Sequence, residues 1–346
     1  MARTTADRRA TEYPAHEDAR EIEDGLWRIA VPLPFALRSA NIYLIANGDG
    51  SWTLVDAGLG QAADEEALRE GLARAGVAPE RVSALILTHA HPDHIGLANT
   101  IQQAGGAPAY MLRGEDEHLY GVWSGRGDDR FGPLERMYVE NGLPVEVAEA
   151  GRAMSVLTRK MLRLPKPESL QLVEDGETLR IGAHSYECVW TPGHSDYHLC
   201  LLREDGLFIA GDHILPTITP NIGLYPAARP DPLGDYFDAL QRVRDLPARL
   251  VLPGHRLPFV ALSERVDELR LHHEERSVLL REHLRARPEG ADAATLSSAL
   301  FGDRLRTNDD LRFALVETLA HLEYLRLRGR VERQIVDGRA LYVMAD

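Results

Sequence analysis

The sequence predicts a layered α/β fold followed by a smaller, mainly helical C-terminal region. Short β-rich runs alternate with helical patterns from about residue 25 to residue 252, which is typical of two sheets sandwiched between helices. Beyond Leu257 the pattern changes to a long amphipathic helix. At 346 residues the chain is also longer than one compact core usually holds, so we expect two unequal domains.

The first half of the chain carries three β-rich runs separated by turn residues, which predict an antiparallel sheet, and then a helix, a buried strand and a second helix. These elements are expected at residues 26–31, 41–45, 52–56, 62–75, 82–87 and 95–103. The second half predicts five more strands, a helix and a last strand. Their expected positions are 170–172, 177–181, 186–190, 198–202, 207–210, 232–243 and 250–252.

Residues 114–164 interrupt this regular pattern. The stretch lacks strand character and contains helical pieces at 135–140 and 148–162. We interpret it as a helical insertion that forms a lid or a wall of a substrate pocket, with ordinary packing as the alternative.

Composition favours a soluble protein in a reducing compartment. Residues 1–20 mix both charges, lack the apolar core of a signal peptide and are expected to form a mobile tail. No apolar run is long enough to cross a bilayer, so no membrane partner is expected. The two cysteines, Cys188 and Cys200, lie in strand-like apolar runs and predict buried packing in a cytoplasmic protein. The net charge of −14 opposes nucleic acid as a partner.

A histidine-rich segment follows the predicted strand at 82–87 and reads Thr88-His89-Ala90-His91-Pro92-Asp93-His94. His89 and His91 alternate in an extended turn, so both imidazoles can reach one cation, and imidazole nitrogens suit zinc. Asp93 and His94 can face the other way, towards a second cation. Four potential ligands within six positions are hard to explain by packing, so one loop could hold two metal ions.

This segment resembles the His-x-His-x-Asp-His signature of the metallo-β-lactamase superfamily, and the match is complete. The family also places an aspartate before the motif and three ligands after it. The chain supplies these residues in the expected order, as Asp56, His194, Asp212 and His255. The resemblance covers about residues 25–257 and implies an αββα sandwich in this catalytic part of the chain.

The resemblance also implies which side chains bind metal. It gives a first site, a second site and a bridging ligand, which are His89, His91 and His194; Asp93, His94 and His255; and Asp212. Asp56 would be a supporting acceptor that orients the histidines of the loop, with an ordinary strand-terminal aspartate as the alternative. Two divalent ions are implied, and we favour zinc, although iron and manganese suit the same ligands.

Such a pair of metals predicts hydrolysis. Two cations that share a water can lower its pKa from 15.7 to around neutrality while they polarise a carbonyl or phosphoryl oxygen. The expected nucleophile is a metal-bridging hydroxide, held and oriented by Asp93 and Asp212 as the catalytic residues. Thr217, Asn221 and Tyr225 follow Asp212 closely and are candidate substrate contacts, although we favour the alternative of an ordinary proline-punctuated loop.

The motifs look most similar to those of glyoxalase-II-like enzymes, including thioesterases. The resemblance therefore favours a small-molecule acyl substrate, and first a thioester of the acyl-CoA, acyl-carrier or glutathione type. Other branches of the superfamily keep open a lactonase or β-lactamase-like hydrolase and an endoribonuclease. The diiron redox branch is disfavoured because its members replace a histidine of the motif by glutamate, whereas this chain has His91.

Residues 261–346 predict helix, helix and hairpin, an order that suggests a winged helix. A non-enzymatic winged-helix protein that binds nucleic acid is thus a further alternative. Glu317 and Glu323 interrupt the polar face of the second helix, however, so we expect this domain to serve packing or dimerisation, with a homodimer as the partner.

Overall fold

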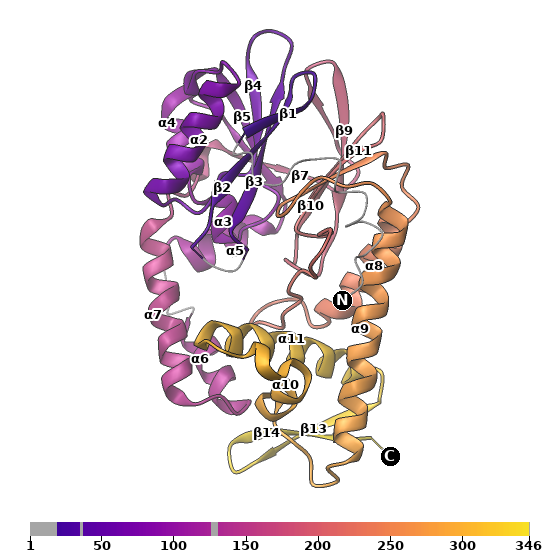
Figure 1. Cartoon of the computed structure of the whole chain (residues 1–346). Coiled ribbons are helices and arrows are strands. Elements are labelled where there is room, and N and C mark those ends of the chain that lie inside the picture. Colours follow the sequence, from indigo (N-terminus) through magenta and orange to yellow (C-terminus); the bar gives the residue numbers. More distant parts are fainter. Residues whose placement is uncertain (1–18, 35–36, 126–130, 346) are drawn as a thin grey trace.

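The larger, N-terminal part of the chain is a sandwich of two β-sheets with helices on both outer faces (Figure 1). The computed structural model describes residues 19–34, 37–125 and 131–345. Within this part of the chain, the αββα arrangement expected from the sequence is confirmed.

The first sheet has seven strands in the order β1-β2-β3-β4-β5-β6-β7. They are β1 (Ala19–Glu23), β2 (Leu26–Pro32), β3 (Ser39–Ala46), β4 (Trp52–Val55), β5 (Val82–Ile86), β6 (Ala109–Leu112) and β7 (Leu170–Val173). The strands from β1 to β4 pair antiparallel, as the turn residues between the runs that form β2, β3 and β4 predicted. Pairing from β4 to β7 is parallel, because helices or longer segments connect these strands.

The second sheet has five strands in the order β12-β11-β10-β9-β8. They are β8 (Thr178–Ile181), β9 (His184–Trp190), β10 (Leu199–Arg203), β11 (Leu207–Gly211) and β12 (Leu250–Pro253). Apolar side chains from the inner faces of both sheets, such as Ile45 and Leu201, form one buried cluster between the sheets.

Helices cover the outer face of each sheet. The first sheet packs against α2 (Ala62–Arg74) and α4 (Ala98–Gly105), and the second against α8 (Pro232–Val243) and α9 (Leu262–Arg285). On α8 the apolar residues recur on one buried face, and Asp231 caps the helix by accepting from Gly234 N. Single-turn 3-10 helices are η2 (Pro79–Arg81), η3 (Pro167–Ser169) and η4 (Gly302–Arg304).

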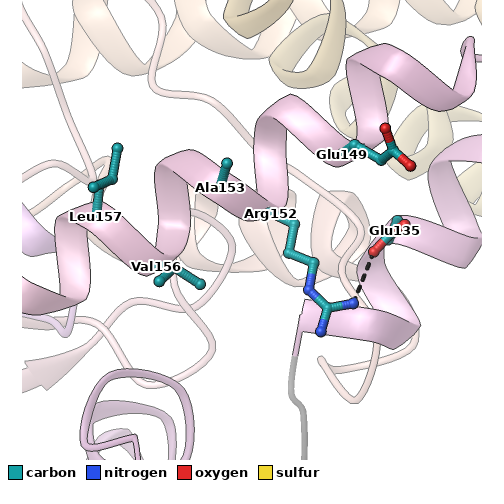
Figure 2. A pocket seen from close by; sticks show the side chains of 6 residues that line it. All are labelled: Glu135, Glu149, Arg152, Ala153, Val156 and Leu157. Atoms are coloured by element: carbon teal, nitrogen blue, oxygen red, sulfur yellow. Dashed lines mark hydrogen bonds and ion pairs between the residues drawn. The ribbon is translucent and has the colours of Figure 1, made fainter.

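Three helices, α5 (Glu115–Trp123), α6 (Phe131–Glu140) and α7 (Val145–Met161), lie between β6 and β7, within the expected insertion. A surface cleft of about 540 Å³ lies along α6 and α7 (Figure 2). The cleft is lined by Glu135, Glu149, Arg152, Ala153, Val156 and Leu157. None of these is a candidate metal ligand, and whether the insertion acts as a lid stays a prediction.

The C-terminal region contains α10 (Ala293–Phe301), α11 (Asn308–Leu327) and the hairpin of β13 (Val331–Val336) and β14 (Arg339–Met344). The order of helix, helix and hairpin is as expected, while the winged-helix assignment stays a prediction. Figure 1 shows α7 and α9 running along opposite sides, from the sandwich to this region. Side chains of α6, α7 and α9 share a buried cluster with α10, α11 and β14.

Two expectations about local structure need correction. Ala19 and Arg20, expected in the mobile tail, belong to strand β1 and pair with β2. The remainder of that tail, residues 1–18, lies outside the described residues. The helix expected at 95–103 is two helices, α3 (Pro92–Ile95) and α4, because Gly96 packs against the backbone of the loop before α2. A Cβ atom on Gly96 would lie 2.1 Å from the carbonyl carbon of Leu59.

In the described part of the chain, every helix is too short or too polar to cross a membrane.

Asn41 on β3 ties the first sheet to the loop that follows β12 in the second sheet. Its buried side-chain nitrogen donates to the carbonyl of Pro253 at 2.8 Å and to that of Arg256 at 2.7 Å. Its side-chain oxygen accepts from Arg28 at 3.0 Å. The hydroxyl of Tyr43 donates to the same Pro253 carbonyl at 2.7 Å. The loop after β12 is therefore fixed to β3 by buried hydrogen bonds.

Replacing Asn41 by Ala should lower the free energy of unfolding by about 2–4 kcal/mol, because several buried hydrogen bonds are lost together. Tyr43→Phe removes one bond to the same loop and should cost about 1 kcal/mol. Denaturant unfolding of both variants measures the difference. Equal destabilisation of the two variants would contradict the role given to Asn41.

Candidate metal centre

The expected ligands gather where strands of both sheets end. His89 follows β5, His194 follows β9, and Asp212 and His255 follow β11 and β12. These strands run in the same direction within each sheet, so their carboxyl ends lie along one edge of the sandwich. Such edges fix side chains through the core while the loops remain accessible.

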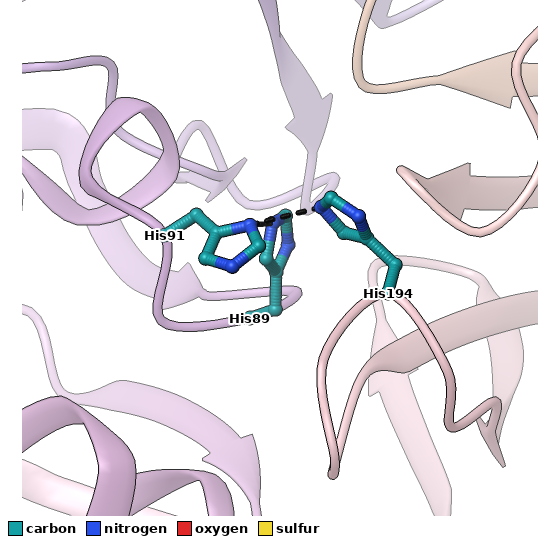
Figure 3. A group of neighbouring side chains, drawn as sticks. All are labelled: His89, His91 and His194. Atoms are coloured by element: carbon teal, nitrogen blue, oxygen red, sulfur yellow. Dashed lines mark hydrogen bonds between the residues drawn. The ribbon is translucent and has the colours of Figure 1, made fainter. Parts of the chain in front are cut away.

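Three histidines form the first cluster, in which the rings of His89, His91 and His194 point towards one another (Figure 3). His89 Nε2 lies 3.0 Å from His91 Nδ1, which lies 2.9 Å from His194 Nε2. Nitrogens that share one tetrahedral zinc at about 2.0 Å stand roughly 3.3 Å apart. The spacing in the cluster is close to that of three ligands of one ion.

Asp93, His94 and His255 form a second cluster beside the first. One carboxylate oxygen of Asp93 lies 3.4 Å from His255 Nε2 and 3.9 Å from His94 Nε2. Asp93 and His94 both lie on the single turn of α3, and Pro92 at its first position fixes the start of that turn. The extended turn expected at this point is therefore helical after His91.

Asp212 lies between the two clusters. The same oxygen, Oδ2, is 3.5 Å from Nε2 of His194 in the first cluster and 3.2 Å from Nε2 of His255 in the second. It is also 3.7 Å from His94 Nε2. The structure thus brings all seven expected ligands together, with one carboxylate in reach of both groups.

Several polar atoms of this site have no hydrogen-bond partner in the part of the chain that the structure describes, which is the arrangement expected of metal ligands. His94 Nε2, His255 Nε2 and Asp212 Oδ1 are buried and have no hydrogen-bond partner among the described residues. Buried polar atoms are almost always satisfied, so three together indicate a missing partner. Space beside them is kept free by Gly254, whose Cβ atom would lie 2.2 Å from Asp212 Oδ1.

The two clusters differ in charge. Burial and the neighbouring histidines hold the pKa of His89 and that of His91 well below the usual range, and burial also lowers the pKa of His194. These imidazoles are neutral at pH 7 and offer lone pairs.

Carboxylates dominate the second cluster. Burial opposes the charge of His94, but Asp56 and Asp212 outweigh it and raise the pKa of His94 well above its usual range. Burial also opposes the charge of His255, yet Asp212 and Asp93 raise the pKa of His255 to about 10. Burial alone would raise the pKa of Asp93 and that of Asp212, but the adjacent histidines lower both.

Asp56 lies behind the loop and accepts four hydrogen bonds. They come from Thr88 N at 2.8 Å, from the Thr88 hydroxyl to both oxygens at 3.0 and 2.9 Å, and from His94 Nδ1 at 2.8 Å. With Nδ1 of His94 occupied, only Nε2 remains to face the site. Asp56 touches His89 only indirectly, through the Thr88 hydroxyl at 2.9 Å from His89 Nδ1.

Backbone carbonyls orient two further histidines. His255 Nδ1 donates to the Ser39 carbonyl at 2.7 Å, and His194 Nδ1 donates to the Asn221 carbonyl at 2.9 Å. Each bond leaves Nε2 of the histidine pointing into the site, as orienting partners do for metal-binding histidines.

The three candidate substrate contacts lie differently from one another. Asn221 reaches the site with its backbone carbonyl, while its side chain donates to Glu317 Oε2 at 3.1 Å and to the Phe313 carbonyl at 3.2 Å on α11. The ring of Tyr225 packs over Gly223 and against the C-terminal cluster. Thr217 is exposed. Contact of any of them with substrate stays a prediction.

Sequence reasoning missed two residues that touch the site's loops. His198 is buried, and its Nε2 accepts from the backbone N–H of Asp212 at 3.1 Å. Glu115 is buried at the start of α5 and binds the loops of His89 and His194. Its position directly after β6, at the same sheet edge as the motif, was the available signal.

The described residues also include a third group of potential ligands, His273, Glu317 and His321, all buried. Glu317 is already paired there with the guanidinium of Arg276, and His273 Nδ1 lies 3.2 Å from His321 Nε2. The adjacent positive charge of Arg276 disfavours a cation here, although His273 Nε2 has no hydrogen-bond partner among the described residues.

Family models match most of the chain. A model described as metallo-beta-lactamase superfamily matches residues 36–255, and one described as metallo-beta-lactamase-like, C-terminal domain, matches residues 280–344. The probable metallo-hydrolase YqjP of Bacillus subtilis is 28% identical over 249 residues, which are 69% of this chain and 74% of that protein. The beta-lactamase-like protein 2 homolog of Caenorhabditis elegans is 29% identical over 280 residues, covering 77% of this chain and 75% of that protein.

Solved structures of similar proteins cover nearly the whole chain. A metallo-beta-lactamase family protein from Thermus thermophilus is 33% identical with a TM-score of 0.82, and the match covers 94% of this chain and 100% of that one. A beta-lactamase domain protein from Burkholderia ambifaria is 29% identical with a TM-score of 0.81, covering 96% and 95%. The chain belongs to the metallo-β-lactamase superfamily and is a metal-dependent hydrolase.

Proposed function

We propose that this hydrolase uses two divalent metal ions to cleave a carbonyl ester, and that its substrate is a thioester. The observation that carries the proposal is the position of Asp212, whose Oδ2 lies within 3.5 Å of a histidine from each cluster. A single carboxylate shared by two adjacent ligand groups suits two close cations.

In this proposal the three-histidine cluster holds one ion, the cluster of Asp93, His94 and His255 holds the other, and Asp212 joins them. When bound, the two ions supply an acidified water and polarise the carbonyl oxygen of the substrate. Zinc is our first choice because imidazole, which suits zinc, supplies five of the six ligands of the two clusters.

The residues of the chain hold and move protons around that water. The low pKa of Asp93 and that of Asp212 keep both carboxylates ionised, so they act as acceptors that orient the attacking water. Asp56 keeps the Nδ1 proton of His94 in place and prevents ring rotation. For a leaving group that needs a proton, Asp93 or Asp212 can afterwards return it.

The choice of a thioester rests on chemistry and on one relative. The atrochrysone carboxyl ACP thioesterase of Aspergillus fumigatus is 26% identical over 255 residues, which are 72% of this chain and 61% of that protein. A thiolate leaves more readily than an amine, so the leaving group needs no dedicated acid from the protein. The net charge of −14 makes a nucleic-acid substrate the weaker alternative.

Asp212→Asn should lower turnover by more than about 100-fold. Loss of the shared negative charge should weaken the binding of both metal ions by several kcal/mol. Elemental analysis of the wild-type protein should find two metal ions per chain, and the variant should retain fewer. Asp245→Asn, at an exposed position, is the matched control and should behave as wild type. Full turnover in Asp212→Asn would refute the ligand assignment.

A substrate panel tests the reaction class. Acyl-CoA and acyl-glutathione thioesters should be hydrolysed with a higher kcat/KM than lactones, a β-lactam or single-stranded RNA. Asp212→Asn serves as the blank that corrects for spontaneous hydrolysis. Cleavage of RNA without cleavage of any thioester would replace our proposal with the endoribonuclease alternative.

Proton release distinguishes the two proposed sites. In the metal-free protein the neighbouring carboxylates raise the pKa of His94 and that of His255, so an ion at their site competes with protons for these nitrogens. The first cluster has lowered pKa values and no such protons to lose. Affinity at the second site should therefore fall as the pH falls.

Calorimetric titration in two buffers of different ionisation enthalpy measures this release. His91→Ala, which disrupts only the first cluster, should still release protons on binding zinc at pH 7.5. His255→Asn, which disrupts the second cluster, should bind zinc at the remaining site with little release. Equal release in both variants would contradict the charge difference between the clusters.

A further inference from the structure

Glu115 is a fully buried carboxylate outside the proposed ligand set. It is the first residue of α5, and its exposed fraction is 0%. An acidic side chain at this depth is rare unless it is paired or hydrogen-bonded. Its partners therefore indicate why it is there.

Within the described part of the chain, every hydrogen bond to the Glu115 carboxylate comes from the two loops that carry the three-histidine cluster. Oε1 accepts from the backbone N–H of Ala90 at 2.8 Å and from the Ser195 hydroxyl at 2.5 Å. Oε2 accepts from the backbone N–H of Tyr197 at 3.0 Å. Ala90 lies between His89 and His91, and Ser195 directly follows His194.

The last residue of α5, Trp123, also binds the backbone of Ala90. Trp123 Nε1 donates to the Ala90 carbonyl at 2.9 Å. Both polar backbone groups of Ala90 are thus bonded to α5, one at each end of a nine-residue helix. A rigid helix between these two bonds fixes the peptide groups that join the histidines of the motif.

An ionised carboxylate is the side chain that this position requires. Three donors converge on two oxygens, and an ionised carboxylate only accepts hydrogen bonds. The start of α5 adds the positive end of the helix dipole. Glutamine would place an N–H₂ group against one of the three donors, so its isosteric shape would not preserve the bonding.

We infer that Glu115 is a positioning residue that sets the separation between the His89–His91 loop and the His194 loop, and thereby the metal affinity of the three-histidine site. The inference rests on the proposed two-metal function, because it takes these histidines as ligands of one ion. Glu115 has no contact with the cluster of Asp93, His94 and His255 among its hydrogen bonds. Its effect should therefore be confined to one of the two sites.

The test is stepwise zinc titration of the metal-free protein against a competing chelator, for wild type, Glu115→Gln and Glu117→Gln. Glu117 lies on the same helix and is exposed, so its variant is the matched control. Glu115→Gln should weaken one zinc site by about 10- to 100-fold and leave the other unchanged. Histidine NMR signals should identify the weakened site as that of His89, His91 and His194.

Ser195→Ala provides a second variant that removes one donor without altering α5. It should lower the zinc affinity of the same site by a few-fold. If Glu115→Gln does not fold, Ser195→Ala alone is used for the test. Wild-type loading in Glu115→Gln, or equal weakening of both sites in either variant, would overturn the positioning role. Fewer than two zinc ions in the wild-type protein would instead overturn the proposed function, since the role of Glu115 is judged on the three-histidine site alone.

Discussion

The candidate site depends on one electrostatic constraint, which is that buried carboxylates and imidazoles must balance each other at the edge of the sandwich. The burial of Asp212 and the partial burial of Asp93 oppose their negative charge, while the adjacent histidines lower the pKa of both carboxylates. In the metal-free protein the same contacts raise the pKa of His94 and that of His255. A bound metal ion would supply positive charge beside the same carboxylates, so the same residues suit the metal-free and the metal-bound protein.

This charge balance requires that each candidate ligand be fixed in position. The residues that fix the ligands come from four parts of the chain. Asn41 on β3 fixes the loop of His255, and Asp56 after β4 fixes His94. Glu115 on α5 joins the loops of His89 and His194. On the far side, α11 reaches the site through Glu317, which binds the Asn221 side chain, while the Asn221 carbonyl orients His194. The C-terminal region is therefore connected to the metal centre through Asn221, whose side chain binds both Glu317 and the Phe313 carbonyl of α11.

The sequence was informative wherever a residue's role depends on its neighbours in the chain. The motif from His89 to His94, the strand-terminal position of Asp56, and the alternation of strands and helices all rest on local spacing, and the structure contains each of them. Contacts between residues far apart in the sequence could not be predicted from local spacing. Glu115 stood in a stretch interpreted only as helical, because its acceptor role depends on loops 25 and 80 residues away. The break at Gly96 likewise arises from contact with the backbone at Leu59, which no local pattern encodes.

These connections also restrict which part of the insertion can move. Helix α5 is bonded to Ala90 at both ends, so its displacement would disturb the histidines themselves. Helix α7 buries Val147 and Ala148 in the cluster that contains Leu315 of α11, and α11 in turn positions Asn221. A lid motion of α6 and α7 would therefore carry the C-terminal region with it and reach His194 through the Asn221 carbonyl. The elements around the candidate site are thus the same ones that orient its histidines, and displacing them would displace these side chains as well.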